Sequence, residues 1–276
     1  GRADRVRRDR GRPARGAHGS GVQALRSDRS LSFWHDTVGD DLTPRSSLDG
    51  DLDVDVAIVG GGLTGLWTAW SLLQAAPGTR VVILEREIAG FGASGRNGGW
   101  CSALFPTSST GLAAKHGRDA AVAMRRAMIN TVDEVGRSAA AAGIDCDFVK
   151  GGTVVYARDE VQRRAAMADV AATEAFGAGL DGVDTLEWWG PDRVRAAGAV
   201  GATFDPACAR LHPAKLVRGL AHAVEAAGGR ILEGTAVESV EPATAAHRAR
   251  AGTRRGTVTA DAVIVATERH TPGQPG

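Results

Sequence analysis

The chain has 276 residues and a mass of 28.5 kDa, enough for about two domains of ordinary size. Its 43% hydrophobic and 24% charged residues exclude collagen-like, wholly disordered and multi-span membrane proteins. The net charge of +1 hides an asymmetry, because residues 1–30 hold nine arginines against three aspartates and residues 31–276 therefore carry −5. A mildly acidic folded part argues against nucleic-acid binding.

The two ends of the chain differ in composition from the rest. Residues 1–29 are rich in Arg, Gly and Asp and have almost no apolar periodicity. Such a segment buries too little apolar surface to offset the entropy lost on ordering, so we expect a disordered basic tail. Residue 1 is Gly rather than Met, and the sequence stops soon after a predicted buried strand, so we expect an N-terminal fragment of a longer protein.

Cysteine and histidine usage bears on the compartment and on metals. Cys101, Cys146 and Cys208 form no CxxC pair and no even-numbered framework, which favours a reducing compartment, so the expected location is cytoplasmic. The seven histidines show no metal-ligand spacing, and no metal site is predicted. Residues 56–79 carry no charge, but consecutive glycines and Pro77-Gly78 interrupt them, so no membrane span is predicted.

The predicted elements begin after an extended segment in which the adjacent His35 and Asp36 point to opposite sides and form no catalytic pair. A strand over 55–59, a helix over 63–73 and a buried strand over 81–84 predict a βαβ unit in a parallel sheet. The remaining predictions, in chain order, are a glycine-rich loop at 90–99, a helix over 111–142, a strand or hairpin over 147–158, helices over 160–176 and from Pro213 to Gly228-Gly229, and strands over 230–240 and 257–267.

The strongest chemical signal is Gly60-x-Gly62-x-x-Gly65, which follows a strand and opens a helix. The first glycine permits the tight turn, the second lets backbone approach a pyrophosphate, and the third lets the helix pack on the sheet. A pyrophosphate would then lie at the helix N-terminus, where free amides and the helix dipole favour an anion. Alone the pattern is weak and also fits a glycine turn used for packing, but its βαβ context favours dinucleotide binding.

Two further features refine that prediction. Glu85, at the end of the second strand, is placed to accept hydrogen bonds from ribose hydroxyls, and its charge disfavours a 2′-phosphate. The loop over 89–100 offers small residues together with Ser94, Arg96 and Asn97, where an NAD enzyme would normally continue into another crossover helix. Such a loop can line a long cofactor beyond its pyrophosphate, although by itself it also fits a flexible surface loop with an anion-attracting arginine.

The segments 56–85 and 92–100 together resemble the N-terminal part of the D-amino acid oxidase-like (DAO family) FAD-dependent oxidoreductases. The bacterial gamma-glutamylputrescine oxidoreductase-like subgroup is the most similar, because residues 32–37 and the loop 95–99 look like its pattern. The resemblance continues through three later segments and covers most of 31–276. These segments are 211–216, 233–237 and 265–268.

The resemblance implies a glutathione-reductase-type, Rossmann-like α/β FAD-binding domain interrupted by a partial antiparallel substrate domain and truncated at the C-terminus. The implied division is a tail over 1–29, the FAD-binding domain over 30–146 and 205–276, and the partial substrate domain over 147–204. The implied FAD contacts are Gly60, Gly62 and Gly65 at the pyrophosphate, Glu85 at the adenosine ribose, Ser94, Arg96, Asn97 and Gly98 beside the phosphates, ribityl chain and flavin edge, and the Val237 backbone at adenine.

The implied activity is oxidation of the C–N bond of a small-molecule amine or amino acid by hydride transfer to flavin, after which the imine is hydrolysed. Oxygen or another electron acceptor would reoxidise the flavin. No residue of the sequence is assigned as catalytic. Two alternatives remain open at this point: an NAD-dependent dehydrogenase, and a truncated, non-catalytic fragment that binds a nucleotide weakly or not at all.

Overall fold

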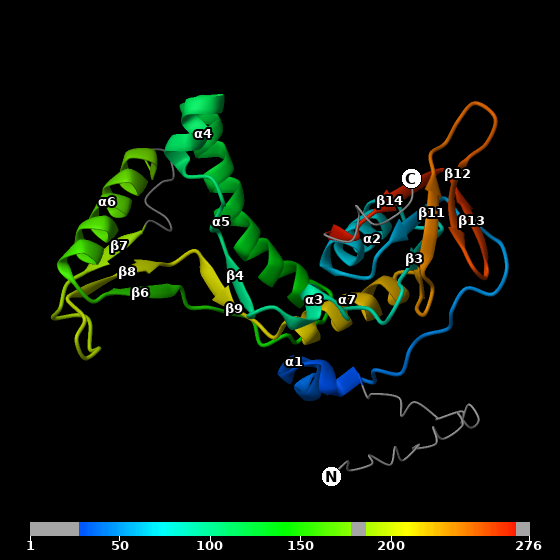
Figure 1. Ribbon diagram of the computed structural model, residues 1–276, viewed down its shortest axis with the longest axis horizontal. Coiled ribbons are helices and arrows are strands. Elements are labelled where there is room, and N and C mark those ends of the chain that lie inside the picture. Colours follow the sequence, from blue (N-terminus) through cyan, green and yellow to red (C-terminus); the bar gives the residue numbers. More distant parts are fainter. Residues whose placement is uncertain (1–27, 178–185, 269–276) are drawn as a thin grey trace, which may run out of the picture.

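The computed structural model describes residues 28–177 and 186–268, which form two lobes (Figure 1). The predicted disordered tail lies outside the described residues except for its last two positions, which belong to the short 3₁₀ helix η1 (Asp28–Leu31). Lobe 1 contains a parallel sheet and a second, mostly antiparallel sheet, and lobe 2 contains two small antiparallel sheets. The long helix α5 (Arg118–Ala141) rises from lobe 1 along the edge of lobe 2 (Figure 1).

A four-stranded parallel sheet forms the centre of lobe 1. Its strands, in spatial order, are β10 (Arg230–Leu232), β3 (Val81–Leu84), β2 (Val56–Val59) and β14 (Ala262–Val265). Because successive strand residues face opposite sides, Ile58 and Ile83 pack under helices whereas Ala57 and Val82 face the second sheet. Both faces are therefore covered, which explains why these strands are continuously apolar. The predicted βαβ unit is confirmed.

Two helices cover the Ile58 side of the parallel sheet, α2 (Leu63–Ala75) and α7 (Pro213–Ala226). Proline at the first helical position of α7 is preorganised for a helix, and the His212 Nδ1 caps it by accepting from the Lys215 amide at 3.2 Å. Leu216, Leu220 and Val224 fall on one face of α7 and are all buried. The predicted helix from Pro213 and its apolar face are confirmed.

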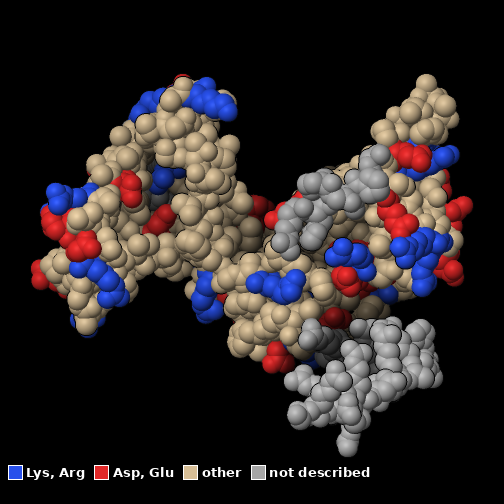
Figure 2. Space-filling model, viewed as in Figure 1, with Lys and Arg blue, Asp and Glu red and all other residues tan. Residues whose placement is uncertain are grey.

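A second sheet covers the other side of the parallel sheet. Its strands, in spatial order, are β1 (Leu52–Asp53), β13 (Gly256–Ala260), β12 (Ala249–Thr253) and β11 (Val237–Glu241). Val258 and Ala260 complete a buried cluster with Ala57 and Val82 between the two sheets. On the face in Figure 2, acidic and basic side chains lie next to one another over this sheet, in keeping with surface ion pairs such as Arg248 Nε–Asp261 Oδ1 at 2.7 Å.

Lobe 2 is built on two three-stranded antiparallel sheets. The first joins β4 (Trp100–Ser102), β9 (Cys208–Arg210) and β5 (Val149–Lys150), and the second joins β6 (Thr153–Ala157), β8 (Gly201–Asp205) and β7 (Glu187–Trp189). Helices α4 (Ser109–His116), α5 and α6 (Glu160–Gly177) complete the lobe. The predicted helix over 160–176 and the strands around Gly151-Gly152 are confirmed.

Three predictions of local structure are wrong. The single helix over 111–142 is two helices, because Gly117 adopts φ +88° and separates α4 from α5. The predicted strands over 230–240 and 257–267 are each split between the two sheets of lobe 1, and β12 was not predicted. The segment expected to be extended around His35 is the helix α1 (Phe33–Thr37), which Ser32 caps.

Among the described residues, no helix combines the length and apolar character that a membrane span requires. The three cysteines are free thiols, of which Cys146 and Cys208 are buried. Burial raises the pKa of all three thiols above their ordinary value, so they pack as small apolar groups.

Candidate dinucleotide-binding site

The first glycine turn connects β2 to α2 and needs glycine at both of its ends. Gly60 has φ +111°, donates its amide to the Leu84 carbonyl at 2.9 Å, and would place a Cβ 2.6 Å from the Ala266 carbonyl oxygen. A Cβ on Gly65 would overlap the Gly60 carbonyl. The sequence motif therefore has a steric basis: only glycine lets the chain leave the sheet and return as a helix in this space.

The second glycine-rich loop, at 90–99, contacts the N-terminus of α2. Gly62 is the N-cap residue and offers no side chain, whereas the Ser94 hydroxyl accepts from the Leu63 amide at 2.9 Å. A Cβ on Gly62 would lie 2.9 Å from that same hydroxyl oxygen. The first amides of a helix have no intrahelical acceptor, so this end attracts an anion, and Ser94 is at its edge.

The second loop repeats the spacing of the first as Gly90-x-Gly92-x-x-Gly95. Gly90 has φ +83°, and a Cβ on Gly95 would overlap the Gly90 carbonyl, as Gly65 would overlap Gly60. The loop opens the short helix α3 (Ala93–Arg96). The sequence predicted that this loop lines a long cofactor on the basis of its small residues, Ser94, Arg96 and Asn97; the repeat of the glycine spacing 30 residues later is a further signal for the same loop.

The second loop, which contacts the α2 terminus through Ser94, has five exposed residues between 92 and 98: Gly92, Ala93, Arg96, Asn97 and Gly98. No atom lies within 4 Å of a Cβ position on Gly92 or Gly98, so the space above them is open. Asn97 Oδ1 accepts from the Gly99 amide at 2.8 Å and shapes the turn into β4. The Arg96 guanidinium carbon lies 5.1 Å from the Phe91 ring centroid, which holds this cation on the loop.

Glu85 ties the end of β3 to the first glycine turn. Its Oε2 accepts from the Gly61 amide at 2.6 Å and its Oε1 from the Glu87 amide at 2.9 Å. Burial raises the pKa of Glu85 above its ordinary value, although these two amides act to lower it. The Glu85 carboxylate therefore lies at the end of β3 and beside the first glycine turn. Its contact with a ribose stays a prediction.

The segment that leads into β11 runs beside Glu85. The Thr235 amide donates to the Glu85 carbonyl at 2.8 Å, and Val237 follows at a bulge in the pairing of β11 with β12. Ser94 and Glu85 therefore both contact the first glycine turn, and Val237 lies in the second sheet, two residues after the Thr235 contact with Glu85. The contact of the Val237 backbone with adenine stays a prediction.

A buried carboxylate that no sequence pattern singled out, that of Glu233, supports the second loop. Glu233 is fully buried, and its Oε1 accepts from the Ala89 amide at 2.8 Å and from Arg45 Nη1 at 2.9 Å. Its Oε2 accepts from the Arg45 amide at 2.7 Å, and Arg218 Nη1 lies 3.5 Å from Oε1. A buried charge needs such partners, and these partners come from segments far apart in sequence that no local pattern connects.

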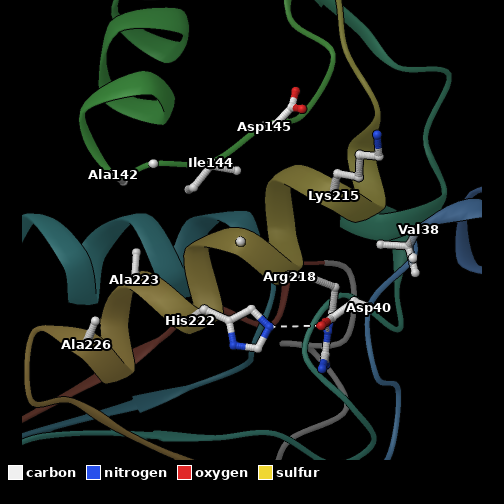
Figure 3. Close-up of a pocket in the computed structure, with 13 residues that line it drawn as sticks. Val38, Asp40, Ala142, Ile144, Asp145, Lys215, Arg218, His222, Ala223 and Ala226 are labelled. Carbon is white, nitrogen blue, oxygen red and sulfur yellow. Dashed lines mark hydrogen bonds and ion pairs between the residues drawn. The ribbon is translucent and has the colours of Figure 1, made fainter.

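A cavity of about 560 Å³ lies along α7, and no residue of either glycine turn lines it (Figure 3). The turn 142–145 and the segment 38–40 complete its wall. Its basic side chains already have partners: Arg218 Nε is 2.6 Å and His222 Nε2 is 3.1 Å from Asp40, and Lys215 Nζ is 2.8 Å from Asp147. The cavity therefore offers an anion little unpaired positive charge. Within the described ranges, no three metal-ligating side chains gather.

The covered parallel sheet, the two adjacent glycine turns and the acid after β3 together define an α/β dinucleotide-binding protein. The chain belongs to the DAO family of FAD-dependent oxidoreductases, whose family model matches residues 55–274. FAD is therefore the dinucleotide, rather than the NAD of the alternative left open by the motif. The residues present fit this cofactor, because the second loop has open space at Gly92 and Gly98 and places Ser94 at the N-terminus of α2.

Two curated relatives show what the chain is similar to. It is 31% identical over 241 residues to the gamma-glutamylputrescine oxidoreductase of Escherichia coli (strain K12), covering 85% of this chain and 54% of the relative. It is 31% identical over 183 residues to a probable oxidoreductase, OrdL, of Haemophilus influenzae, covering 65% of this chain and 41% of the relative. The chain thus spans about half the length of the curated relatives it matches.

Solved structures agree on the fold. The chain matches glycine oxidase from Geobacillus kaustophilus with a TM-score of 0.61 and 25% identity, over 78% of this chain and 55% of that one. It matches L-proline dehydrogenase from P. horikoshii with a TM-score of 0.62 and 17% identity, over 84% and 55% of the two chains. At that lower identity the similarity shows the fold alone.

Proposed function

We propose that this chain forms the FAD-binding part of an oxidoreductase that oxidises the C–N bond of a small amine or amino acid. The observation that carries the proposal is the hydrogen bond between Ser94 and the first amide of α2, because it joins the two glycine turns into one continuous surface. Family membership and relatives named for amine or amino-acid oxidation support it.

The proposed contacts follow the geometry of that surface. The pyrophosphate would lie over the turn formed by Gly60, Gly62 and Gly65, against the amides of α2. Glu85 keeps free lone pairs after accepting from Gly61 and Glu87, so its carboxylate can also accept from ribose hydroxyls. The remaining proposed contacts are Ser94, Arg96, Asn97 and Gly98 along the phosphates, ribityl chain and flavin edge, and the Val237 backbone at adenine.

The proposed division of the chain follows the same argument. Residues 30–146 and 205–276 would supply the FAD-binding domain, and 147–204 part of a substrate domain. Bound FAD would accept a hydride from the carbon that bears the amine, and water would then hydrolyse the imine to a carbonyl. Oxygen or another carrier would be the electron acceptor. We assign no catalytic residue within the described ranges.

FAD binding is tested with the purified chain and one matched pair of glycine variants. We expect the chain to bind FAD, with a visible flavin spectrum, and Gly62→Val to weaken binding at least about tenfold, since its side chain would meet Ser94 Oγ and fill the pyrophosphate surface. Gly151→Val is the control, because Gly151 lies between β5 and β6 with no atom within 4 Å of a Cβ position. Equal FAD affinity in the two variants, or none in the parent chain, would contradict the proposed site.

The proposed chemistry is tested by anaerobic reduction. A panel of primary and secondary amines and amino acids is added to the flavin-loaded protein, and loss of visible flavin absorbance is followed. We expect at least one amine to bleach the flavin and to yield the matching carbonyl compound. If a loaded protein is bleached by dithionite but by no amine, the substrate class is wrong although the FAD site stands.

A further inference from the structure

The helix α1 lies against the second glycine turn and fixes one side chain there. It contacts both α3 and α7, although it precedes them by some 60 and 180 residues. Ser32 caps α1 by accepting from the His35 amide at 3.3 Å, and its hydroxyl is also 2.9 Å from His35 Nδ1. Because the same short turn holds both the backbone and the ring, the orientation of the imidazole is set before it meets the loop.

The His35 ring packs on the backbone of the second turn. The ring is 1% exposed, and a Cβ on Gly95 would lie 3.1 Å from His35 Cε1 while overlapping the Gly90 carbonyl. The Gly90 carbonyl and the imidazole together therefore occupy the space that a side chain on Gly95 would need. When the Ser32 hydroxyl donates to Nδ1, the ring proton is on Nε2, on the side that faces the Gly90 backbone.

The charges around His35 keep the ring neutral. Burial lowers its pKa, and the cations Arg96 on α3 and Arg218 on α7 lower it further. A hydrogen bond to the Gly90 backbone and the charge of Asp28 on η1 act in the opposite direction, but the net shift is downward. A protonated ring would place a second cation beside Arg96 at the loop.

The rest of α1 is anchored to α7 as well as to the loop. Thr37 Oγ1 lies 3.1 Å from His212 Nε2, and the Trp34 ring meets the His212 ring edge-on at a centroid distance of 4.9 Å. Trp34 also lies 3.5 Å from the Cβ position of Gly99, where the loop ends. His212 caps α7, so α1 is fixed to the main helix of lobe 1 and provides a rigid support for the loop.

We propose that His35 is a positioning residue that holds the Gly90–Gly95 turn in the conformation that receives FAD. This inference deepens the proposed function and rests on it for the identity of the ligand. His35 itself lies behind the loop and is not proposed to touch the cofactor. Its effect on the loop can therefore be measured without the cofactor as well as with it.

The experiment compares three variants of the full chain. His35→Phe keeps a ring but removes both nitrogens, His35→Gln keeps an amide donor and acceptor, and His116→Phe changes an exposed histidine at the end of α4. Hydrogen exchange is measured by mass spectrometry on peptides that cover 88–99, and FAD affinity by titration. In His35→Phe we expect exchange in 88–99 to accelerate about tenfold, the scale of one lost buried hydrogen bond, and FAD affinity to fall by a similar factor.

Two further results distinguish positioning by the imidazole nitrogens from simple filling of space: rescue by His35→Gln and a pH dependence that this variant lacks. His35→Gln should recover most of the protection in 88–99. The control His116→Phe should exchange as the parent does. In the parent, protection of 88–99 should fall as pH drops below about 6.5, whereas in His35→Gln this pH dependence should disappear. Peptides from β3 and from α2 beyond its first turn should not change with either substitution, whereas the Leu63 amide depends on its cap from Ser94.

The outcomes separate the inference from the proposed function. Unchanged exchange in 88–99, or equal acceleration in α2 and β3, overturns the positioning role whatever happens to FAD. If the parent binds no FAD but exchange responds as expected, the positioning role stands and the proposed function fails. If exchange responds and FAD affinity in His35→Phe equals that of the parent, the loop is positioned for something other than FAD and the inference is overturned.

Discussion

The Ser94 hydroxyl accepts a hydrogen bond from the Leu63 amide at 2.9 Å, so a residue of the second loop caps the helix of the first. Gly62, the N-cap residue itself, has no side chain that could do so. The cap is therefore supplied from 31 residues away, and the Ser94 hydroxyl lies 2.9 Å from the position that a Cβ on Gly62 would take.

Ser94→Ala tests whether the Ser94 hydroxyl contributes to FAD binding in addition to capping α2. We expect a loss of about 1 kcal/mol in the free energy of unfolding, as for other N-cap deletions, together with weaker FAD binding. Ser108→Ala is the matched control, because Ser108 caps α4 by accepting from the Gly111 amide at 3.1 Å in lobe 2. Urea unfolding should show similar losses for both, and FAD titration a change only for Ser94→Ala; equal FAD affinities would count against the role of Ser94.

The two glycines of the second turn should respond differently to alanine. In Gly95→Ala the new methyl group overlaps the Gly90 carbonyl and contacts His35, so we expect a loss of about 1–3 kcal/mol in the free energy of unfolding. In Gly92→Ala it meets nothing within 4 Å, and stability should change by less than about 0.5 kcal/mol. Urea unfolding curves of the two variants decide this, and a reversed order would show that the turn is built differently.

The buried carboxylate of Glu233 is the next test. Glu233→Gln removes one of two carboxylate partners from both Arg45 and Arg218 and turns an amide group toward buried donors, so we expect a loss of about 2–3 kcal/mol in the free energy of unfolding. Glu238→Gln removes an exposed partner of Arg254 and should cost less than about 1 kcal/mol. Denaturant unfolding measures both, and near-equal losses would mean that the Glu233 network contributes little.

The cap of α7 predicts an acid-sensitive contribution to stability. Burial lowers the pKa of His212, as does the charge of Lys215, while Asp147 raises it, and the net shift is downward from 6.5. A depressed histidine pKa means that the unfolded chain binds the proton more readily, so this contribution is complete above about pH 6.5 and is lost as pH falls below it. Protonation also blocks the Nδ1 that accepts from the Lys215 amide.

His212→Asn tests that dependence, since Asn can cap a helix and does not titrate. Between pH 7 and about pH 5.5, the free energy of unfolding should fall more steeply in the parent than in the variant. Comparing the two proteins at each pH removes the contribution of other titrating groups. Parallel curves would show that His212 does not titrate in this range on folding.

The local features of lobe 1 could be predicted because they depend on neighbouring residues. The apolar runs at 56–59 and 81–84 and the glycines between them define a βαβ unit without reference to the rest of the chain. The positions at which helices and strands end were harder to predict. Gly117 divides a predicted helix into α4 and α5, and β10 ends at Leu232, just before the buried Glu233, whose carboxylate accepts from the Ala89 amide.

The sequence by itself determined the first glycine turn, the acid that follows β3 and the small residues of the second loop, because backbone sterics at a glycine act within a few residues. Only the tertiary structure decided that Ser94 reaches Leu63, that Glu233 reaches Ala89 across 144 residues, and that His35 lies against Gly95. Hydrogen bonds and close contacts of this kind depend on distances of a few ångströms between separate elements. Those distances are set when the sheet and its helices pack together, and no spacing along the chain encodes them.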